Sequence, residues 1–456
     1  MENTMLQQRK QCRLVLFPLP FQGHINPMIQ LANILHSKGF SISIVHTRFN
    51  SPDPFKHPHF TFHFISDGLT SDVRDKPLDP VLIIKQLNNN CAEPFRQCLN
   101  ELLSDGKENN VKCIITDTNW YCAQEVADSL KLPRIVLRTS SICAFLAFAA
   151  LPRIREKGYL SNPEPNIEEP IVELPHLKVK DIPTIDISKL EDLYQLVGDF
   201  VESSKKAFGL IFNTFKELEE HDLEKLSEQF LMPIFTIGPF HKHFSAGRSS
   251  LLTQDRSCIS WLDTQAPKSV LYVSFGSVAT MNQEKLYEMA WGLADSKQPF
   301  LWVVRPGLVH GLDQWLESLP NELLESINER GYVIKWAPQQ EVLSHPAVGG
   351  FWTHNGWNST LESVCEGVPM ISSPFFGDQK VNARYVNDVW RIGIRLEKGF
   401  KREEIEKAIR RLMVDKEGED MRQRIMCLKE KADLCLNVGG SSYRSLEGLV
   451  DFISSL

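Results

Sequence analysis

A histidine in a position suited to a catalytic base lies near the start of the chain. Residues 18–27 read PLPFQGHINP, and His24 follows a short apolar run directly before an expected helix. An imidazole can accept or donate a proton near neutral pH, so this side chain could act as a general base. A surface histidine without a chemical role is the other interpretation, and the letters QGH alone favour it.

A second concentration of chemically useful residues lies at 336–379. Within it, FWTHNGWNSTLES indicates a strand, a tight turn at Gly356 and the start of a helix. The residues NST at 358–360 would then lie at a helix N-terminus, where free backbone N–H groups and the helix dipole attract a phosphate. An ordinary capped helix is the other interpretation, because these residue types are common at helix starts without a ligand.

Other side chains of the same run could complete a nucleotide-sugar site. His354 adds a hydrogen-bond donor, and Glu362, on the same face of the expected helix, could accept from ribose hydroxyls. Trp336 offers a flat apolar face to a base, while Asp378 and Gln379 could bind a polyol such as a sugar. Neither a P-loop motif nor the glycine fingerprint of dinucleotide-binding proteins is present.

The elements that must position these residues alternate between strand and helix patterns. Apolar runs such as 13–19 and 111–117 are typical of buried parallel strands, and 25–39 has the apolar spacing of a helix. The Pro/Glu-rich region 150–200 is expected to be irregular. The sequence therefore predicts an α/β fold with two doubly wound domains. The expected parts are an N-terminal domain at 1–240, a polar linker at 241–256, a C-terminal domain at 257–435 and a final helix at 436–456 that packs back on the N-terminal domain.

Doubly wound sheets bind their ligands beyond the carboxyl ends of their strands. In the first domain this rule selects His24 and Asp117, which ends the run VKCIITD. In the second domain it selects Ser277, His354 and Asp378. Two such edges facing each other across a cleft would form a site for two substrates.

Composition excludes several other classes of protein. The 456 residues have a net charge of −7 and no long basic block, so nucleic acid and anionic membranes are not expected partners. The ten cysteines include no C-x-x-C pair and indicate buried thiols in a reducing compartment. The polar N-terminus and the short apolar runs predict neither a signal peptide nor a membrane span. We therefore expect a cytoplasmic protein.

The forty-four residues from Trp336 to Gln379 resemble the signature box of plant family-1 UDP-dependent glycosyltransferases. The resemblance rests on WAPQ, HNGWNS and DQ at the family's full length, and it extends to GHINP, FGS, LWVVRP and GGSS elsewhere in the chain. The sequence is most similar to the glucosyltransferases that include steviol-glycoside and small hydroxy-acid enzymes. This resemblance implies a GT-B fold, with two Rossmann-like domains facing across a cleft.

The resemblance also implies a set of donor-binding residues. Trp336 would stack on uracil, Glu362 would hold the ribose hydroxyls, and the end of the box would meet the sugar. Gln379 and Trp357 favour glucose in this family, and Asn355 stands where many members have cysteine. The residues implied to bind the UDP-sugar are Ser277, Trp336, Ala337, Gln339, His354, Trp357, Asn358, Ser359, Glu362, Asp378 and Gln379. Thr139 and Ser140, at the end of PRIVLRTS, are further expected to touch the sugar.

His24 matches the family's general base, and Asp117 matches the carboxylate that orients it. The implied reaction is an inverting transfer of glucose from UDP-glucose to a hydroxyl or carboxyl of a small plant metabolite, which gives a β-glucoside. A phenolic or hydroxy acid, a flavonoid, a terpenoid or a terpenoid glycoside could be the acceptor. The enzyme is expected to be a monomer without a cofactor or metal, and the chain has no D-x-D motif to hold a metal-bridged diphosphate.

Two other classes of function stay open at this point. A sensor could bind a UDP-sugar without turning it over, although such a protein would not need both His24 and Asp117. A nucleotide-sugar epimerase on the same fold would need carboxylates beside the sugar, and the box supplies only Asp378.

Overall fold

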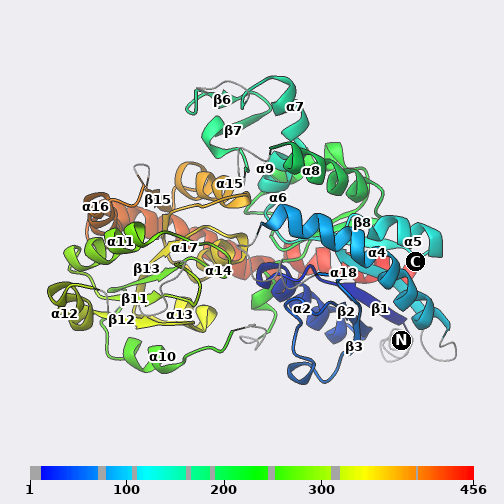
Figure 1. Ribbon diagram of the computed structural model, residues 1–456, viewed down its shortest axis with the longest axis horizontal. Helices are drawn as coiled ribbons and strands as arrows, with labels where there is room; N and C mark the ends of the chain where they lie inside the picture. Colours follow the sequence, from blue (N-terminus) through cyan, green and yellow to red (C-terminus); the bar gives the residue numbers. More distant parts are fainter. Residues whose placement is uncertain are drawn as a thin grey trace. The chain divides into compact units, whose positions relative to one another are not determined.

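The computed structural model describes residues 12–69, 79–104, 110–160, 166–184, 190–244, 252–309, 319–396 and 399–456. The chain forms two compact units (Figure 1). Unit 1 comprises Met1–Pro163, Thr184–Leu251 and Leu434–Leu456, and unit 2 comprises Glu164–Pro183 and Leu252–Asp433. Of the expected linker at 241–256, residues 245–251 lie outside the described part of the chain.

Unit 1 is built on a parallel sheet with the strand order β3-β2-β1-β4-β5-β8-β9. The strands are β1 (Cys12–Phe17), β2 (Ser41–His46), β3 (Thr61–Phe64), β4 (Asn110–Asp117), β5 (Arg134–Arg138), β8 (Gly209–Phe212) and β9 (Ile234–Thr236). Central strands are buried on both faces, which explains why their sequences are continuous apolar runs instead of alternating ones.

Helices cover both faces of this sheet. Alternate residues of β1 face opposite sides: Leu14 and Leu16 join the core beneath the helix at Gln22–Ser37, while Phe17 stacks on Phe95 and Trp120. The helices of unit 1 are α2 (Gln22–Ser37), α4 (Pro80–Ser104), α5 (Ala123–Leu130), α6 (Ile142–Ala149), α7 (Leu151–Glu156), α8 (Leu190–Lys205), α9 (Glu220–Gln229) and α18 (Ser441–Ser455).

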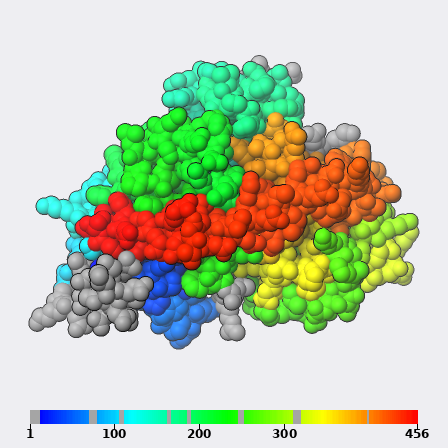
Figure 2. All heavy atoms as spheres, turned by 180° about the vertical axis from the view of Figure 1, so that it is seen from behind, coloured from blue at the N-terminus to red at the C-terminus, as the bar shows by residue number. Residues whose placement is uncertain are grey.

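The last helix of the chain, α18, belongs to unit 1. It contributes Leu446, Leu449, Val450 and Ile453 to the core that contains α2 and β1. At its edge, Lys38 Nζ lies 2.6 Å from a carboxylate oxygen of Glu447. Figure 2 shows α18, in red, along the surface of the unit.

Unit 2 is built on a second parallel sheet, with the order β12-β11-β10-β13-β14-β15. The strands are β10 (Val270–Ser274), β11 (Phe300–Val303), β12 (Gly331–Ile334), β13 (Val348–Thr353), β14 (Met370–Ser372) and β15 (Gly393–Arg395). The helices are α10 (Ser257–Leu262), α11 (Gln283–Asp295), α12 (Asn321–Arg330), α13 (Gln339–Ser344), α14 (Trp357–Glu366), α15 (Asp378–Arg384), α16 (Arg402–Met413) and α17 (Lys416–Leu436), of which α17 continues into unit 1.

The expectation that 150–200 is irregular was wrong. This region contains α7, a short antiparallel hairpin of β6 (Pro170–Ile171) and β7 (Leu174–Lys178), a 3-10 turn η2 (Val179–Asp181) and much of α8. The sequence of α8 buries apolar residues at helical spacing, including Leu193, Leu196, Val197 and Phe200.

The α/β fold class expected from the sequence is confirmed. Both units have a doubly wound parallel sheet covered by helices, and the expected runs 13–19 and 111–117 form β1 and β4 with ends shifted by one or two residues. In the described part of the chain, no helix is both long and apolar enough to cross a bilayer.

Candidate active site

Each sheet has a point at which its strand order reverses. In unit 1 the first strand, β1, lies between β2 and β4, and in unit 2 the strand β10 lies between β11 and β13. Loops that leave the carboxyl ends of such neighbouring strands diverge and leave room for a ligand. His24 follows β1 and Asp117 ends β4, while Ser277 follows β10 and His354 follows β13. Each unit therefore places its candidate residues at its own switch point.

The structure joins the imidazole of His24 to the carboxylate of Asp117. His24 Nδ1 lies 2.7 Å from Asp117 Oδ2, with Asp117 fully buried and the His24 side chain 27% exposed. The other carboxylate oxygen, Oδ1, accepts from the backbone N–H of Asn119 at 2.9 Å and from its side-chain amide at 3.0 Å. A carboxylate only accepts hydrogen bonds, so we assign the imidazole hydrogen to Nδ1. The basic nitrogen of His24 is then Nε2.

The surroundings of Asp117 keep it ionised. Burial raises the pKa of this carboxyl, but His24, the hydrogen bond from Asn119 and the charge of Arg138 lower it more, so the pKa lies below its ordinary value. Asp117 is therefore negatively charged at neutral pH. A fixed negative charge at Nδ1 would stabilise the imidazolium that forms when Nε2 takes a proton.

His24 lies inside a helix and not in the loop before one. The sequence suggested a helix start at Ile25, whereas α2 begins at Gln22 and contains Pro27. The backbone N–H groups of His24 and Ile25 both donate to the carbonyl of Phe21 and form the first turn. Pro27 lacks the N–H that would bond to the carbonyl of Gly23, and α2 continues past it to Ser37. The helix backbone thereby fixes the position of the imidazole.

In unit 2, a network of amides surrounds Glu362. Gln339 Nε2 donates to Glu362 Oε2 at 2.7 Å and to Ser359 Oγ at 3.0 Å, and Gln340 Nε2 donates to Glu362 Oε1 at 2.9 Å. Burial raises the pKa of Glu362, although the two amide donors act in the opposite direction. The network joins the first residues of α13 to the first two turns of α14. A carboxylate fixed in this way can accept hydrogen bonds from a pair of neighbouring hydroxyls.

The turn between β13 and α14 places an imidazole beside a helix N-terminus. Burial and the nearby Arg305 lower the pKa of His354 to about 4, so the ring is neutral at physiological pH. A Cβ atom added to Gly276 or Gly356 would come within 2.7 or 2.5 Å of Nε2 of this ring. The ring edge is therefore confined between two glycines. Together with the first N–H groups of α14, this arrangement suits an anion such as a phosphate.

Comparison with known proteins decides the family. The model of the family described as UDP-glucoronosyl and UDP-glucosyl transferase matches residues 70–430. UDP-glycosyltransferase 76G1 of Stevia rebaudiana is 52% identical over 464 residues, which cover 100% of both chains. UDP-glycosyltransferase 76B1 of Arabidopsis thaliana is 49% identical over 442 residues, which cover 97% of this chain and 98% of the relative.

The chain belongs to the plant family-1 UDP-glycosyltransferases. It is an enzyme of the glycosyltransferase class, as the resemblance indicated. A solved structure of Phytolacca americana UGT2, complexed with UDP-2fluoro-glucose and pterostilbene, matches it with a TM-score of 0.83 and 30% identity, over 97% of this chain and 99% of that one. The fold is of the GT-B type, which consists of two Rossmann-like domains.

The expected residues at the sugar end of this glycosyltransferase lie on α14 and α15. Asp378 and Gln379 begin α15, and Gln379 Oε1 accepts from the backbone N–H groups of Phe375 at 2.9 Å and Phe376 at 3.2 Å. Trp357, the first residue of α14, is only 3% exposed, with its ring centroid 6.5 Å from that of Trp390. The indole of Trp357 is therefore part of the packing at the start of α14.

The remaining expected residues lie on loops. Trp336 follows β12 and is half-buried, with its carbonyl accepting from the backbone N–H of Asp255 at 2.8 Å, and Ala337 beside it is buried. Ser277 is part of the turn after β10, and Asn358 is half-buried in the first turn of α14.

Thr139 and Ser140 belong to unit 1, at the end of β5. The hydroxyl of Thr139 lies 2.9 Å from His24 Nδ1, so it is a second group beside the proposed base, after Asp117. Ser140 Oγ accepts from Arg138 Nε at 2.7 Å and lies 3.3 Å from the carbonyl of Ser141. Contact of either residue with the sugar stays a prediction.

Two residues of this glycosyltransferase escaped the sequence reasoning. The buried guanidinium of Arg305 donates to the carbonyls of Gly276 and Ala279 and so holds the turn that carries Ser277. Asn382 Nδ2 donates to Asp378 Oδ2 at 3.1 Å and to the carbonyl of Asn355 at 3.0 Å. Asn382 thereby links the start of α15 to the turn beside His354. Arg305 lies in the motif LWVVRP and Asn382 follows Gln379 by three residues, but nothing in the sequence spacing reveals these long-range contacts.

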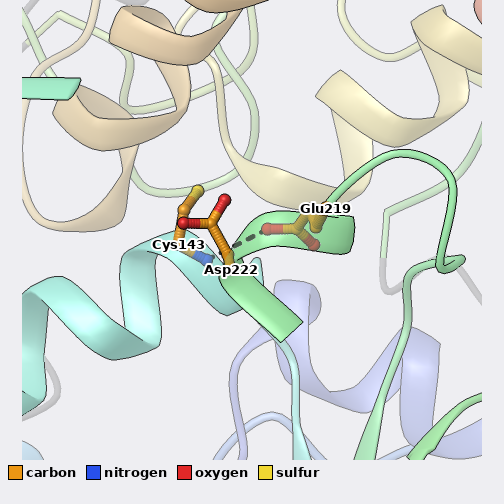
Figure 3. A group of neighbouring side chains, drawn as sticks. All are labelled: Cys143, Glu219 and Asp222. Atoms are coloured by element: carbon orange, nitrogen blue, oxygen red, sulfur yellow. Dashed lines mark hydrogen bonds between the residues drawn. The ribbon is translucent and has the colours of Figure 1, made fainter. Parts of the chain in front are cut away.

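One group of side chains in the described residues has the composition of a metal site. Cys143, Glu219 and Asp222 each place one possible ligand atom within 4.8 Å of the others in unit 1 (Figure 3). Yet Glu219 accepts from the backbone N–H of Cys143 at 3.0 Å, at the start of α6. Burial, with Glu219 and Asp222 nearby, raises the pKa of the Cys143 thiol well above its ordinary value, so the thiol is protonated in this structure. The positive end of α6 favours a carboxylate and disfavours a cation. We therefore interpret the group as a helix cap.

Proposed function

We propose that this enzyme catalyses an inverting, metal-independent transfer of glucose from UDP-glucose to a hydroxyl or carboxyl of a small plant metabolite. The product is a β-glucoside. The observation that carries the proposal is the 2.7 Å contact between His24 Nδ1 and Asp117 Oδ2 at the switch point of the first sheet. This pair has the geometry of a general base with its orienting carboxylate.

In the proposed reaction, His24 Nε2 takes the proton of the acceptor hydroxyl. The acceptor oxygen attacks the anomeric carbon from the side opposite UDP, and the bond between that carbon and the diphosphate oxygen breaks. A single displacement inverts the configuration of the sugar. Asp117 stabilises the imidazolium, which afterwards releases its proton to solvent. A carboxylate acceptor is already deprotonated at neutral pH and would depend less on His24.

Unit 2 supplies the groups that would bind the donor. Trp336, Ala337 and Gln339 would contact the base and ribose, and Glu362 would accept from the ribose hydroxyls. The diphosphate would meet Ser277, His354, Asn358, Ser359 and the N-terminus of α14. Preorganised donors of this kind stabilise the charge that develops on the leaving UDP. They supply this stabilisation without a metal ion.

Glucose is the proposed sugar, and a small molecule is the proposed acceptor. Gln379, Asp378 and Trp357 would contact the sugar, with Thr139 and Ser140 as further contacts. The related structure of Phytolacca americana UGT2 holds UDP-2fluoro-glucose and pterostilbene, which supports a glucose donor and a small acceptor of similar size. We further propose that the N-terminal unit binds the acceptor, and that the enzyme is a cytoplasmic monomer without a cofactor.

The decisive experiment measures UDP release from UDP-glucose with a panel of phenolic acids, flavonoids and terpenoids. The wild type is compared with H24A, and UDP binding to both is measured by calorimetry. We expect acceptor-dependent release that H24A abolishes while UDP still binds. Release that survives in H24A with an acceptor that offers only an alcohol hydroxyl would overturn the base assignment. Tight UDP-glucose binding without release for any acceptor would instead favour the sensor.

A further inference from the structure

A segment from the first half of the sequence is part of the donor-side unit. Residues 164–183 cluster with unit 2, although both flanking parts of the chain belong to unit 1. Within this segment, β7 and η2 both pack against α15. The helix α15 is the one that begins with Asp378 and Gln379, the proposed sugar contacts.

The strongest link between the segment and unit 2 is a buried carboxylate. Asp181 is fully buried, and its Oδ1 lies 2.5 Å from Arg395 Nη1, at the end of β15. Its Oδ2 lies 3.6 Å from Arg384 Nε, at the end of α15, and accepts from the backbone N–H of Lys178 at 3.1 Å. Asp181 thus joins three separate pieces of chain.

Further contacts hold the same end of α15. Arg384 Nε donates to the carbonyl of His176 at 2.8 Å, and the ring of His176 packs edge-on against Tyr385 at 6.0 Å. Lys380, one turn earlier on α15, is a third cation nearby. Burial lowers its pKa, and so does Arg395, whereas Asp181 raises it. Without Asp181, two arginines and a lysine would face one another in a poorly solvated place, which is costly.

We propose that Asp181 is a positioning residue for the sugar end of the donor site. It anchors the C-terminal end of α15, and α15 is a single rigid helix about 10 Å long. The orientation of this helix determines where Asp378 and Gln379 point. This inference rests on the proposed function, because it takes these two residues to bind the donor sugar.

The other end of the donor site has separate supports. The network of Gln339, Ser359 and Glu362 is built from α13 and α14, and within the described residues none of its hydrogen bonds involves Asp181. Loss of Asp181 should therefore disturb recognition of the sugar but not of UDP. This separation distinguishes a positioning role from a general role in stability.

The test compares D181N with the wild type. Calorimetry gives the dissociation constants of UDP and UDP-glucose, and kinetics gives kcat/KM for UDP-glucose and UDP-galactose. We expect the UDP dissociation constant to change less than twofold. We expect kcat/KM for UDP-glucose to fall roughly 10- to 100-fold, because small misplacements at a reacting centre cost about this much. The preference for UDP-glucose over UDP-galactose should shrink. D181E, which keeps the charge, should recover part of the preference.

The matched control is E168Q on the same segment. Glu168 pairs with Lys178 and Lys180 at the surface, 2.8 and 2.7 Å away, so its loss should leave every parameter unchanged. If D181N does not fold, R384Q removes one partner of Asp181 and should give a smaller effect in the same direction. Equal losses for UDP and UDP-glucose, or an unchanged glucose preference, would overturn the inference. Absence of turnover in the wild type would instead count against the proposed function.

Discussion

The hydroxyl of Thr139 lies 2.9 Å from His24 Nδ1, the same nitrogen that faces Asp117. The ring of the proposed base is therefore held by two groups from two neighbouring strands, β4 and β5. A hydroxyl can accept part of the Nδ1 hydrogen bond and keep the ring in the plane that presents Nε2. The arrangement gives Thr139 a role in orienting the base.

Replacing Thr139 with valine keeps the shape of the side chain and removes this hydrogen bond. A single neutral hydrogen bond contributes about 1 kcal/mol, so T139V should lower kcat roughly fivefold. T139S, which keeps the hydroxyl, should stay near the wild type, and UDP affinity should not change in either. Equal kcat values for T139V and the wild type would show that Thr139 does not help to orient His24.

Replacing Asp117 with asparagine should be far more damaging. The amide of asparagine can donate to Nδ1, which would place the imidazole hydrogen on Nε2 and remove its basicity. By analogy with other base–carboxylate pairs, we expect kcat to fall by about 10²- to 10⁴-fold. The measurement is kcat with a weakly acidic alcohol as acceptor. With a more acidic phenol as acceptor, the fall in kcat should be smaller. A uniform loss across acceptors of different acidity would argue for misfolding.

Gly276 should not tolerate a methyl group. Its φ is +67°, and a Cβ there would lie 2.7 Å from Cε1 and Nε2 of His354. G276A should displace the imidazole and weaken UDP binding about 10-fold or more, since a small misplacement in a binding site is costly. The matched control is G399A, where φ is +76° but nothing lies within 4 Å of the added atom. If G276A and G399A lose UDP affinity to the same extent, backbone strain and not contact with the imidazole explains the loss.

Glu219 should make unit 1 more stable in mild acid. Burial and the neighbouring Asp222 raise the pKa of Glu219 to about 7, against an ordinary value of 4.5. The folded state thus binds the proton more tightly than the unfolded state. Stability is therefore greatest below pH 4.5, as far as this group is concerned, and falls as pH rises to about 7, by on the order of 3 kcal/mol.

The variant E219Q removes this titration and keeps an oxygen for the N–H of Cys143. Urea unfolding at pH 5 and pH 8 should show a smaller difference between the two pH values in E219Q than in the wild type. An unchanged difference would assign the titration to Asp222 or to another group. Addition of a chelator should alter neither curve, because the group is interpreted as a helix cap.

Much of the candidate site could be predicted because neighbouring strand ends bring residues together. His24 and Asp117 are far apart in sequence, but β1 and β4 are adjacent in a doubly wound sheet. The start of α2 was misplaced because Pro27 resembles a helix start. The contact of Thr139 depends on a side-chain rotamer, and that of Asp181 on packing between distant segments. Neither has a local pattern in the sequence.

The path of the chain has a practical consequence for recombining this enzyme with its relatives. Three stretches of unit 1 alternate with two of unit 2, so the chain passes from one unit to the other four times. A chimera cut only near residue 251 would take Arg384 and Arg395 from one parent and Asp181 from the other. An exchange that is meant to transfer donor preference intact should therefore move 164–183 together with 252–433.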